Sequence, residues 1–253
     1  MAMDCGEAPT AAMLAIGDEI LSGRTQDTNT NYIARFLAAL GIDLREARVV
    51  PDVETEIVAA VNALRTRYSY VFTTGGIGPT HDDITADAIA KAFHVSIDYH
   101  PEALALIGAR YKLGEFNEMR RRMARIPAGA VLIRNSVSAA PGFQLENVFV
   151  MAGVPMIMRA MLEDVAPRLN KGPPIHTCVV TAPVAEGRIA AALAGIQQRY
   201  ANIAVGSYPF YREAGFGTQL VVRGRDSKQA DAAATEIENA VRSLGFEPSR
   251  ENS

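Results

Sequence analysis

Short apolar runs alternate with segments of helical spacing through most of the chain, and this alternation constrains the fold more than any other feature. The runs at 11–17, 42–50 and 68–74 predict strands. The segments 29–41 and 51–67 between them carry apolar residues on one helical face. Strands that alternate with helices of this length favour a doubly wound, mostly parallel sheet. We therefore predict a three-layer α/β domain over residues 11–170.

The same reasoning extends to the end of this domain. An apolar stretch that contains Glu146 and Asn147 predicts a β-hairpin, with these two residues at its turn although no glycine marks it. A short strand is expected at VSIDY and another strand at 130–135, and the remaining helices are expected at 84–94, 101–113 and 154–169.

A segment rich in helix breakers, NKGPP at 170–174, predicts a domain boundary. Beyond it the order is strand, helix, strand, strand and helix, which favours a small α+β domain of antiparallel strands under two helices at 175–250. Residues 1–10 are expected to form a flexible N-terminal extension.

Composition excludes several classes of function. The 253 residues carry a net charge of only -3, so nothing indicates a nucleic-acid partner. No apolar run is long enough to span a membrane, and we expect no membrane partner. The two cysteines show neither metal-binding spacing nor a disulfide framework, which favours a cytoplasmic location.

The loop TTGGIGPTHDDIT, from Thr73 to Thr85, connects the third strand to the next helix. Ligands of open parallel sheets bind beyond the carboxyl ends of the strands, which is where this loop lies. Gly75, Gly76 and Gly78 let the backbone turn sharply and approach a ligand, and exposed N–H groups there favour a phosphate. The alternative is that the glycines only make a tight turn.

Two adjacent acids, Asp82 and Asp83, follow the glycines. One interpretation is that Asp83 caps the helix beginning at Ile84. A single aspartate would suffice for that, and two adjacent carboxylates repel each other unless a cation or a donor balances them. Carboxylates suit Mg²⁺, which often bridges protein acids and ligand phosphates. We favour a ligand site over a cap.

Acids also follow the first two strands. Asp18 and Glu19 follow strand one and Asp52 follows strand two, so all three are expected at the same edge of the sheet. For Thr28 and Asn29, which begin a helix, capping is the favoured interpretation. Three strands that each deliver an acid to one edge favour a functional site over unrelated surface charges.

These motifs resemble a known family. GDEILSGRTQDTNTNYIARFLAALGI, then VVPD, then TTGGIGPTHDDITADAIAKAF are similar to the molybdopterin-binding family, which includes the MoaB/Mog proteins. The closer resemblance is to the branch formed by the N-terminal part of competence/damage-inducible protein CinA, to which the N-terminal domain of eukaryotic FAD synthases also belongs. It covers residues 11–169 well. The second domain also resembles the module that follows in CinA, with GSYPF at 206–210 as its clearest piece.

The resemblance implies a site that holds a phosphorylated pterin (molybdopterin) or a nucleotide, and a homo-oligomer, a dimer or trimer. It implies catalytic roles for Asp52 and Asp83, and Mg²⁺ or another divalent metal on Asp82 and Asp83 if the protein is catalytic. The residues it assigns to ligand binding are Gly17, Asp18, Glu19, Ser22, Thr74, Gly75, Gly76, Gly78, Pro79, Thr80, Pro141 and Gly142.

The chain departs from the CinA pattern in two places. NSVSAAPGF at 135–143 has serine and alanine where relatives have glycine and threonine, and Ile157 replaces a glutamate. The chain also ends near residue 253, so we expect neither the CinA deamidase domain nor its amidase activity. Two hypotheses remain open: binding without turnover, which we narrowly favour, or a metal-dependent pyrophosphatase acting on ADP-ribose, FAD or NAD.

A basic run, EFNEMRRRMAR, supplies Arg120, Arg121, Arg122 and Arg125. These side chains could reach phosphates of a dinucleotide. A solvated helix face is the favoured interpretation, because a run of charges usually indicates exposure.

Overall fold

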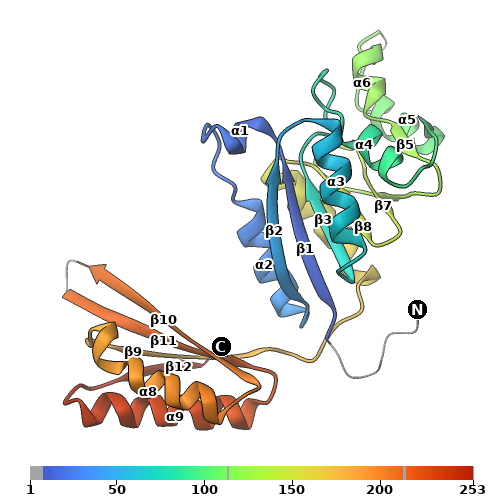
Figure 1. The fold of residues 1–253 in the computed structure, drawn as a ribbon. Coiled ribbons are helices and arrows are strands. Elements are labelled where there is room, and N and C mark those ends of the chain that lie inside the picture. The colour runs from blue at the N-terminus through green and yellow to red at the C-terminus, as the bar shows by residue number, and fades with distance from the viewer. Residues whose placement is uncertain (1–7, 113, 213–214, 253) are drawn as a thin grey trace. The chain divides into compact units, whose positions relative to one another are not determined.

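The computed structural model describes residues 8–112, 114–212 and 215–252, and Figure 1 shows the whole fold. Most of the expected N-terminal extension, residues 1–7, lies outside these ranges, and Thr10 already begins the first strand. The chain forms two compact units, Met1–Gly172 and Pro173–Ser253, which are described separately.

The first unit contains a six-stranded sheet with the order β2-β1-β3-β8-β7-β6. Neighbours among β2, β1, β3 and β8 are parallel, whereas β7 is antiparallel to both β8 and β6. The predicted mostly parallel α/β sheet is therefore confirmed. Its strands are β1 (Thr10–Ile16), β2 (Asp43–Val50), β3 (Tyr70–Thr74), β6 (Val131–Ile133), β7 (Gly142–Leu145) and β8 (Val148–Met151).

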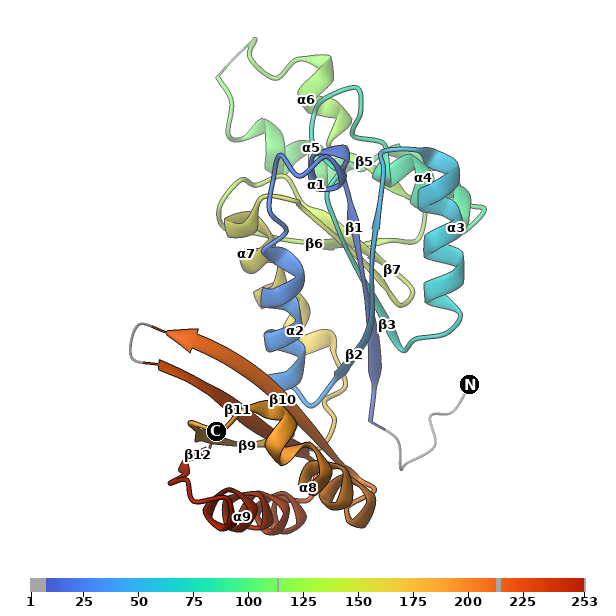
Figure 2. The same ribbon diagram turned by 60° about the vertical axis from the view of Figure 1, so that its left-hand side comes forward.

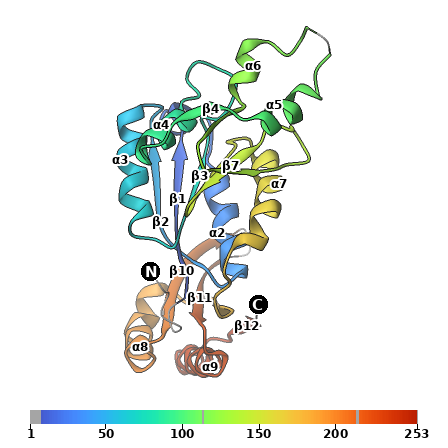
Figure 3. The same ribbon diagram turned by 90° about the vertical axis from the view of Figure 1, so that its right-hand side faces the viewer.

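Helices cover both faces of this sheet, as Figure 3 shows. One core lies under α3 and α4, and the other lies under α2 and α7. The bounds of these helices are α2 (Asn29–Ala39), α3 (Glu54–Arg65), α4 (Thr85–Ala92) and α7 (Pro155–Val165).

Strand β1 shows why the sheet is buried on both sides. Its side chains alternate between the two cores, with Leu14 in the first and Met13 in the second, and both are fully buried. A strand covered on both faces has a continuous apolar run, because neither face meets water. The register pairs Ala15 with both Val49 and Thr74, so β1, β2 and β3 end level with one another.

The hairpin expected around Glu146 and Asn147 is confirmed, because β7 and β8 pair antiparallel on either side of them. Glu146 has φ of 50°, a conformation that usually selects glycine. Asn147 stabilises the turn, since its side-chain amide donates to the carbonyls of Arg65 at 2.9 Å and Tyr68 at 3.0 Å. These hydrogen bonds to the segment between α3 and β3 hold the turn, although it contains no glycine.

Several short elements were not predicted. A single-turn helix, α1 (Asp18–Leu21), stands where a polar loop was expected after β1. A helix, α6, also forms within the basic run. The remaining elements of this unit are β4 (Ile97–Tyr99), α5 (Pro101–Gly108), α6 (Glu118–Arg122), β5 (Arg125–Pro127) and the 3₁₀ helix η1 (Ala166–Arg168).

The second unit is the predicted small α+β domain. It has an antiparallel sheet with the order β10-β11-β9-β12, and both helices share one core with it. The fourth strand, β12, was not predicted and pairs with β9. The bounds are β9 (His176–Ala182), α8 (Glu186–Arg199), β10 (Ile203–Arg212), β11 (Gly215–Gly224), α9 (Ser227–Ser243) and β12 (Ser249–Asn252).

In the part of the chain that the structure describes, no helix combines the length and the apolar character needed to cross a bilayer.

Candidate functional site

The carboxyl ends of the four parallel strands meet at one edge of the first unit, where Figure 2 shows α1 and the loop that leads into α4. Two backbone hydrogen bonds join neighbouring strand ends there. The N–H of Gly17 donates to the carbonyl of Val50 at 3.1 Å, and that of Gly75 donates to the carbonyl of Met151 at 3.2 Å. The loops after β1, β2, β3 and β8 therefore start side by side, and together they form what we call the rim.

Glycine is required at two positions of the loop after β3. Gly75 has φ of 104°, and a Cβ there would lie 2.1 Å from the carbonyl oxygen of Ile16. Gly76 has φ of 65°, and a Cβ there would lie 2.1 Å from the Thr85 hydroxyl. Thr85 fixes the turn, because its hydroxyl donates to the carbonyl of Gly75 at 3.0 Å and its N–H to that of Gly76 at 3.0 Å.

This turn leaves backbone donors available at the rim. The N–H of Gly75 is used within the sheet, but those of Gly76, Ile77 and Gly78 donate to no acceptor among the described residues. All three residues are only half-buried. Successive N–H groups in a turn with positive φ form an anion-binding concavity. This geometry is suited to an anion, and the phosphate site predicted for the loop stays a prediction.

Asp83 holds the far side of the same loop. Its carboxylate accepts from the N–H of Thr80 at 2.8 Å and from the Thr80 hydroxyl at 2.5 Å. It makes no capping hydrogen bond to α4, whose N-cap residue is Ile84, so the capping alternative for Asp83 is wrong. The carboxylate also lies against Gly78, where a Cβ would be 2.6 Å from it. Asp83 thus holds the shape of the loop.

The other predicted acids follow β1 and β2. The carboxylate of Asp52 accepts from the N–H of Asp18 at 3.0 Å. Burial raises the pKa of Asp52 above its ordinary value, and the nearby charges of Asp18, Glu19 and Asp82 raise it further, against the lowering effect of that hydrogen bond. Among the described residues, no lysine or arginine pairs with Asp18, Glu19 or Asp52. The acids therefore converge without a positive partner.

A divalent metal was predicted on Asp82 and Asp83. Across the described ranges, no group of three or more histidine, cysteine, aspartate or glutamate side chains is arranged to hold a metal ion. Asp83 is bonded to Thr80, and Asp82 is largely exposed beside His81. A cation at the rim would therefore need oxygen ligands from a bound phosphate as well as these carboxylates.

Asn29 has a role that the sequence did not reveal. We expected Thr28 and Asn29 to cap α2, but Asp27 supplies the cap, accepting from the N–H groups of Asn29 at 2.9 Å and Thr30 at 3.1 Å. The Asn29 side chain is buried and donates to the carbonyl of Gly153 at 2.7 Å. Its carbonyl oxygen has no partner among the described residues.

Gly153 lies after β8 and touches the glycine loop, because a Cβ at Gly153 would be 3.3 Å from the Cα of Gly75. Asn29 therefore connects the start of α2 with two loops of the rim. Asn29 belongs to the motif DTN, but the position of this motif at the start of a helix favoured a capping role.

The other residues assigned to ligand binding are placed in different ways. Pro79 is exposed at the loop tip, and Pro141 faces the glycine loop across a small hollow. Thr74 is buried at the end of β3, and Ser22 ends α1 with its side chain exposed. Gly142 is buried in β7, where a Cβ would lie 2.2 Å from the carbonyl oxygen of Val150, so packing accounts for this glycine.

Two arginines of the basic run correct the prediction of a solvated face. The side chains of Arg122 and Arg125 are only 30% and 28% exposed, and both approach Asp87 in the first turn of α4. They also line the small hollow beside the glycine loop. Arg120 and Arg121 instead lie over the rings of Tyr111 and Tyr99.

The residue that departs from the resemblance is accommodated by packing. Ile157 lies in the first turns of α7, is partly buried and packs against the core under α2 and α7. An apolar side chain at this position adds no charge to the rim. The acids of the rim therefore come from the loops after β1, β2 and β3.

A mostly parallel sheet between two helical layers, with a glycine loop and acids at the strand ends, defines the α/β class of this domain. Residues 12–171 match the family described as "Probable molybdopterin binding domain", so the chain belongs to the molybdopterin-binding family. Residues 174–248 match the family described as "FAD synthase, middle domain".

Individual proteins agree with this assignment. A protein of Archaeoglobus fulgidus is 32% identical over 229 residues, which are 90% of this chain and 96% of that protein. A CinA-like protein of Syntrophotalea carbinolica is 38% identical over 63% of this chain and 40% of its own length. The crystal structure of CinA from Thermoplasma acidophilum matches 64% of this chain and 98% of its own, with 34% identity and a TM-score of 0.61.

Replacing Asn29 tests whether it holds the rim together. We expect Asn29→Ala to destabilise the protein by about 1 kcal/mol, because the buried Asn29 side chain loses its hydrogen bond to the carbonyl of Gly153. The exposed Asn31 of the same helix provides the control, and Asn31→Ala should change stability by about 0.5 kcal/mol or less. Denaturant unfolding measures both variants, and equal effects would contradict the assigned role.

The raised pKa of Asp52 makes a prediction about pH. Because the folded state disfavours the charged carboxylate, wild-type stability falls as pH rises through the raised pKa. Asp52→Asn removes this loss and still accepts from the N–H of Asp18, so its Tm at pH 7 should exceed that of the wild type by about 1–2 °C. The difference should shrink as the pH approaches 4. A variant with a lower Tm at pH 7 would refute the assigned electrostatics.

Proposed function

We propose that this protein binds a phosphorylated pterin or nucleotide at the rim, with a phosphate on the N–H groups of Gly76, Ile77 and Gly78. The observation that carries the proposal is the positive-φ turn that leaves these donors unused among the described residues. The molybdopterin-binding family to which the chain belongs supports a pterin. The similarity of residues 174–248 to the middle domain of FAD synthase supports a nucleotide.

The neighbouring acids define the other half of the proposed ligand. Asp18, Glu19 and Asp52 repel a phosphate unless a cation or a donor-rich ring lies between them. A bound Mg²⁺ would supply positive charge shared by these carboxylates and the phosphate oxygens. A pterin or purine ring offers N–H groups that can donate hydrogen bonds to these carboxylates. Both possibilities place the anionic part of the ligand on the glycine side and its positive or donating part on the acidic side.

The second candidate function is a metal-dependent pyrophosphatase for ADP-ribose or a related dinucleotide such as FAD or NAD. Asp52 favours it, because a carboxylate with a raised pKa at a ligand site is suited to accepting a proton from water. Water would attack one phosphorus of the diphosphate, and the bond from that phosphorus to the bridging oxygen would break. ADP-ribose would then give AMP and ribose 5-phosphate.

Gly78→Ala tests the binding site. The new Cβ would lie 2.6 Å from the carboxylate of Asp83, which must move and take Thr80 with it. We expect about a tenfold loss of affinity for ADP-ribose in the presence of Mg²⁺, measured by calorimetry. Gly187→Ala in α8 is the control, because a Cβ there meets nothing within 4 Å. Equal affinities of the two variants would argue against the glycine loop as the phosphate site.

Turnover is tested separately. The purified protein is incubated with Mg²⁺ or Co²⁺ and ADP-ribose, FAD or NAD, and AMP is measured by chromatography. If the protein only binds, no AMP forms while binding persists. The exposed Asp98 provides the control variant, Asp98→Ala. If the wild type and Asp98→Ala release AMP but Asp83→Ala does not, the pyrophosphatase replaces the binding proposal.

A further inference from the structure

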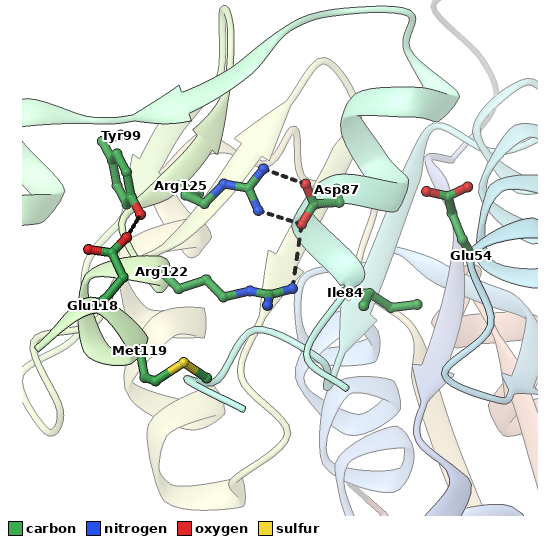
Figure 4. Close-up of a pocket in the computed structure, with 8 residues that line it drawn as sticks. All are labelled: Glu54, Ile84, Asp87, Tyr99, Glu118, Met119, Arg122 and Arg125. Carbon is green, nitrogen blue, oxygen red and sulfur yellow. Dashed lines mark hydrogen bonds and ion pairs between the residues drawn. The ribbon is translucent and has the colours of Figure 1, made fainter. Parts of the chain in front are cut away.

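A cavity of about 630 Å³ opens between α4, α6 and the ends of β4 and β5, and Figure 4 shows its lining. The residues come from segments far apart in the sequence, with Asp87 on α4, Arg122 on α6 and Arg125 on β5. Ile84, Met119 and the ring of Tyr99 add apolar surface. None of the residues assigned to the site from the sequence lines this cavity.

Most of the charges in this cavity are already paired. Arg125 donates to both oxygens of Asp87, at 2.8 and 2.7 Å. Glu118 accepts from the hydroxyl of Tyr99, and Glu54 accepts from Lys91. Each acid that lines the cavity therefore has a partner of its own.

Arg122 is the most weakly engaged of these charges, because its ion pair with Asp87 is long. Its guanidinium approaches Asp87 only at 4.0 Å and donates no hydrogen bond to any residue that the structure describes. A guanidinium has five N–H donors in a planar fork that fits phosphate and carboxylate groups. Figure 4 shows this side chain extending across the cavity toward Asp87 and Ile84. Arg122 thus brings a charge and unused donors to the interior of a cavity.

The cavity adjoins the glycine loop. A smaller hollow next to it, of about 20 Å³, has Gly76, Ile77, Gly78, Arg122 and Arg125 among its lining residues. The glycine loop proposed to hold a phosphate and Arg122 therefore line the same narrow space. The acids of the rim lie outside this lining, apart from Asp83, whose charge is engaged by Thr80.

We propose that Arg122 is a second anion-binding group, so that the ligand carries two linked anionic groups, as a diphosphate does. This inference rests on the proposed function, because it places the first of the two phosphates on Gly76–Gly78. The second phosphate bonds to Arg122, and the group attached beyond it occupies the cavity against Ile84, Met119 and Tyr99. A monophosphate uses the glycine loop alone and gains nothing from Arg122.

Phosphate and pyrophosphate test the inference without a choice of base or sugar. Binding is followed by NMR on ¹⁵N-labelled protein, with the amides of Gly76 and Gly78 reporting the first position and the Nε–H of Arg122 reporting the second. Phosphate should shift the glycine signals alone. Pyrophosphate should shift both sets and bind at least tenfold more tightly, because it adds charge-assisted hydrogen bonds.

Arg122→Gln should abolish this preference while leaving phosphate binding within about twofold. Arg121→Gln is the matched control, since Arg121 lies on the same helix and contacts Glu118 and Tyr99 instead. An equal loss for phosphate and pyrophosphate would reduce Arg122 to a structural partner of Asp87 and overturn the inference. So would unchanged Arg122 signals with pyrophosphate. Absence of glycine shifts with either anion would defeat the proposed function itself, and Arg122 shifts without them would refute only the link between the two positions.

Discussion

The contact between Gly75 and the carbonyl oxygen of Ile16 is the constraint on which the rim depends. No side chain fits there, because a Cβ would lie 2.1 Å from that oxygen. The close approach lets the chain leaving β3 turn against the end of β1, beside Gly153 of the next loop. The turn that follows leaves the N–H groups of Gly76 to Gly78 without acceptors among the described residues. Close backbone packing and a set of unused N–H donors are therefore two results of the same geometry.

Charge is separated around this turn. Asp18, Glu19 and Asp52 gather where β1 and β2 end, whereas Arg122 and Arg125 face the glycines from α6 and β5. Burial, and to a smaller extent the nearby charges of Asp18, Glu19 and Asp82, raise the pKa of Asp52, while Arg125 pairs with Asp87. A ligand with a uniform charge distribution would satisfy only one side. The rim is better matched to a molecule with a phosphorylated end and a donor-rich or cation-bearing end.

Much of the fold could be predicted from the sequence, because strands buried on both faces and amphipathic helices have distinct periodicities. The acids and glycines of the rim could also be found, since strand ends in a parallel sheet share one edge. The function of Asn29 could not, because a helix-starting Asn has the same pattern whether it caps its own helix or bonds a distant carbonyl. For Arg122 a solvated face was favoured over a contact with phosphate for a related reason. A run of charges does not reveal that α6 turns one arginine toward a cavity.

The balance between binding and turnover depends on what Asp83 does when a ligand arrives. In the structure its carboxylate accepts from Thr80, whereas the pKa of Asp52 is raised in the direction that suits accepting a proton. Hydrolysis would need a base and a water at the phosphorus opposite the leaving oxygen. Asp52 lies among the acids, and Ile157 contributes no further carboxylate. Asp52 can orient a ligand by itself, whereas hydrolysis also requires a group that positions the water, which Ile157 does not supply. We therefore favour binding over turnover at the rim.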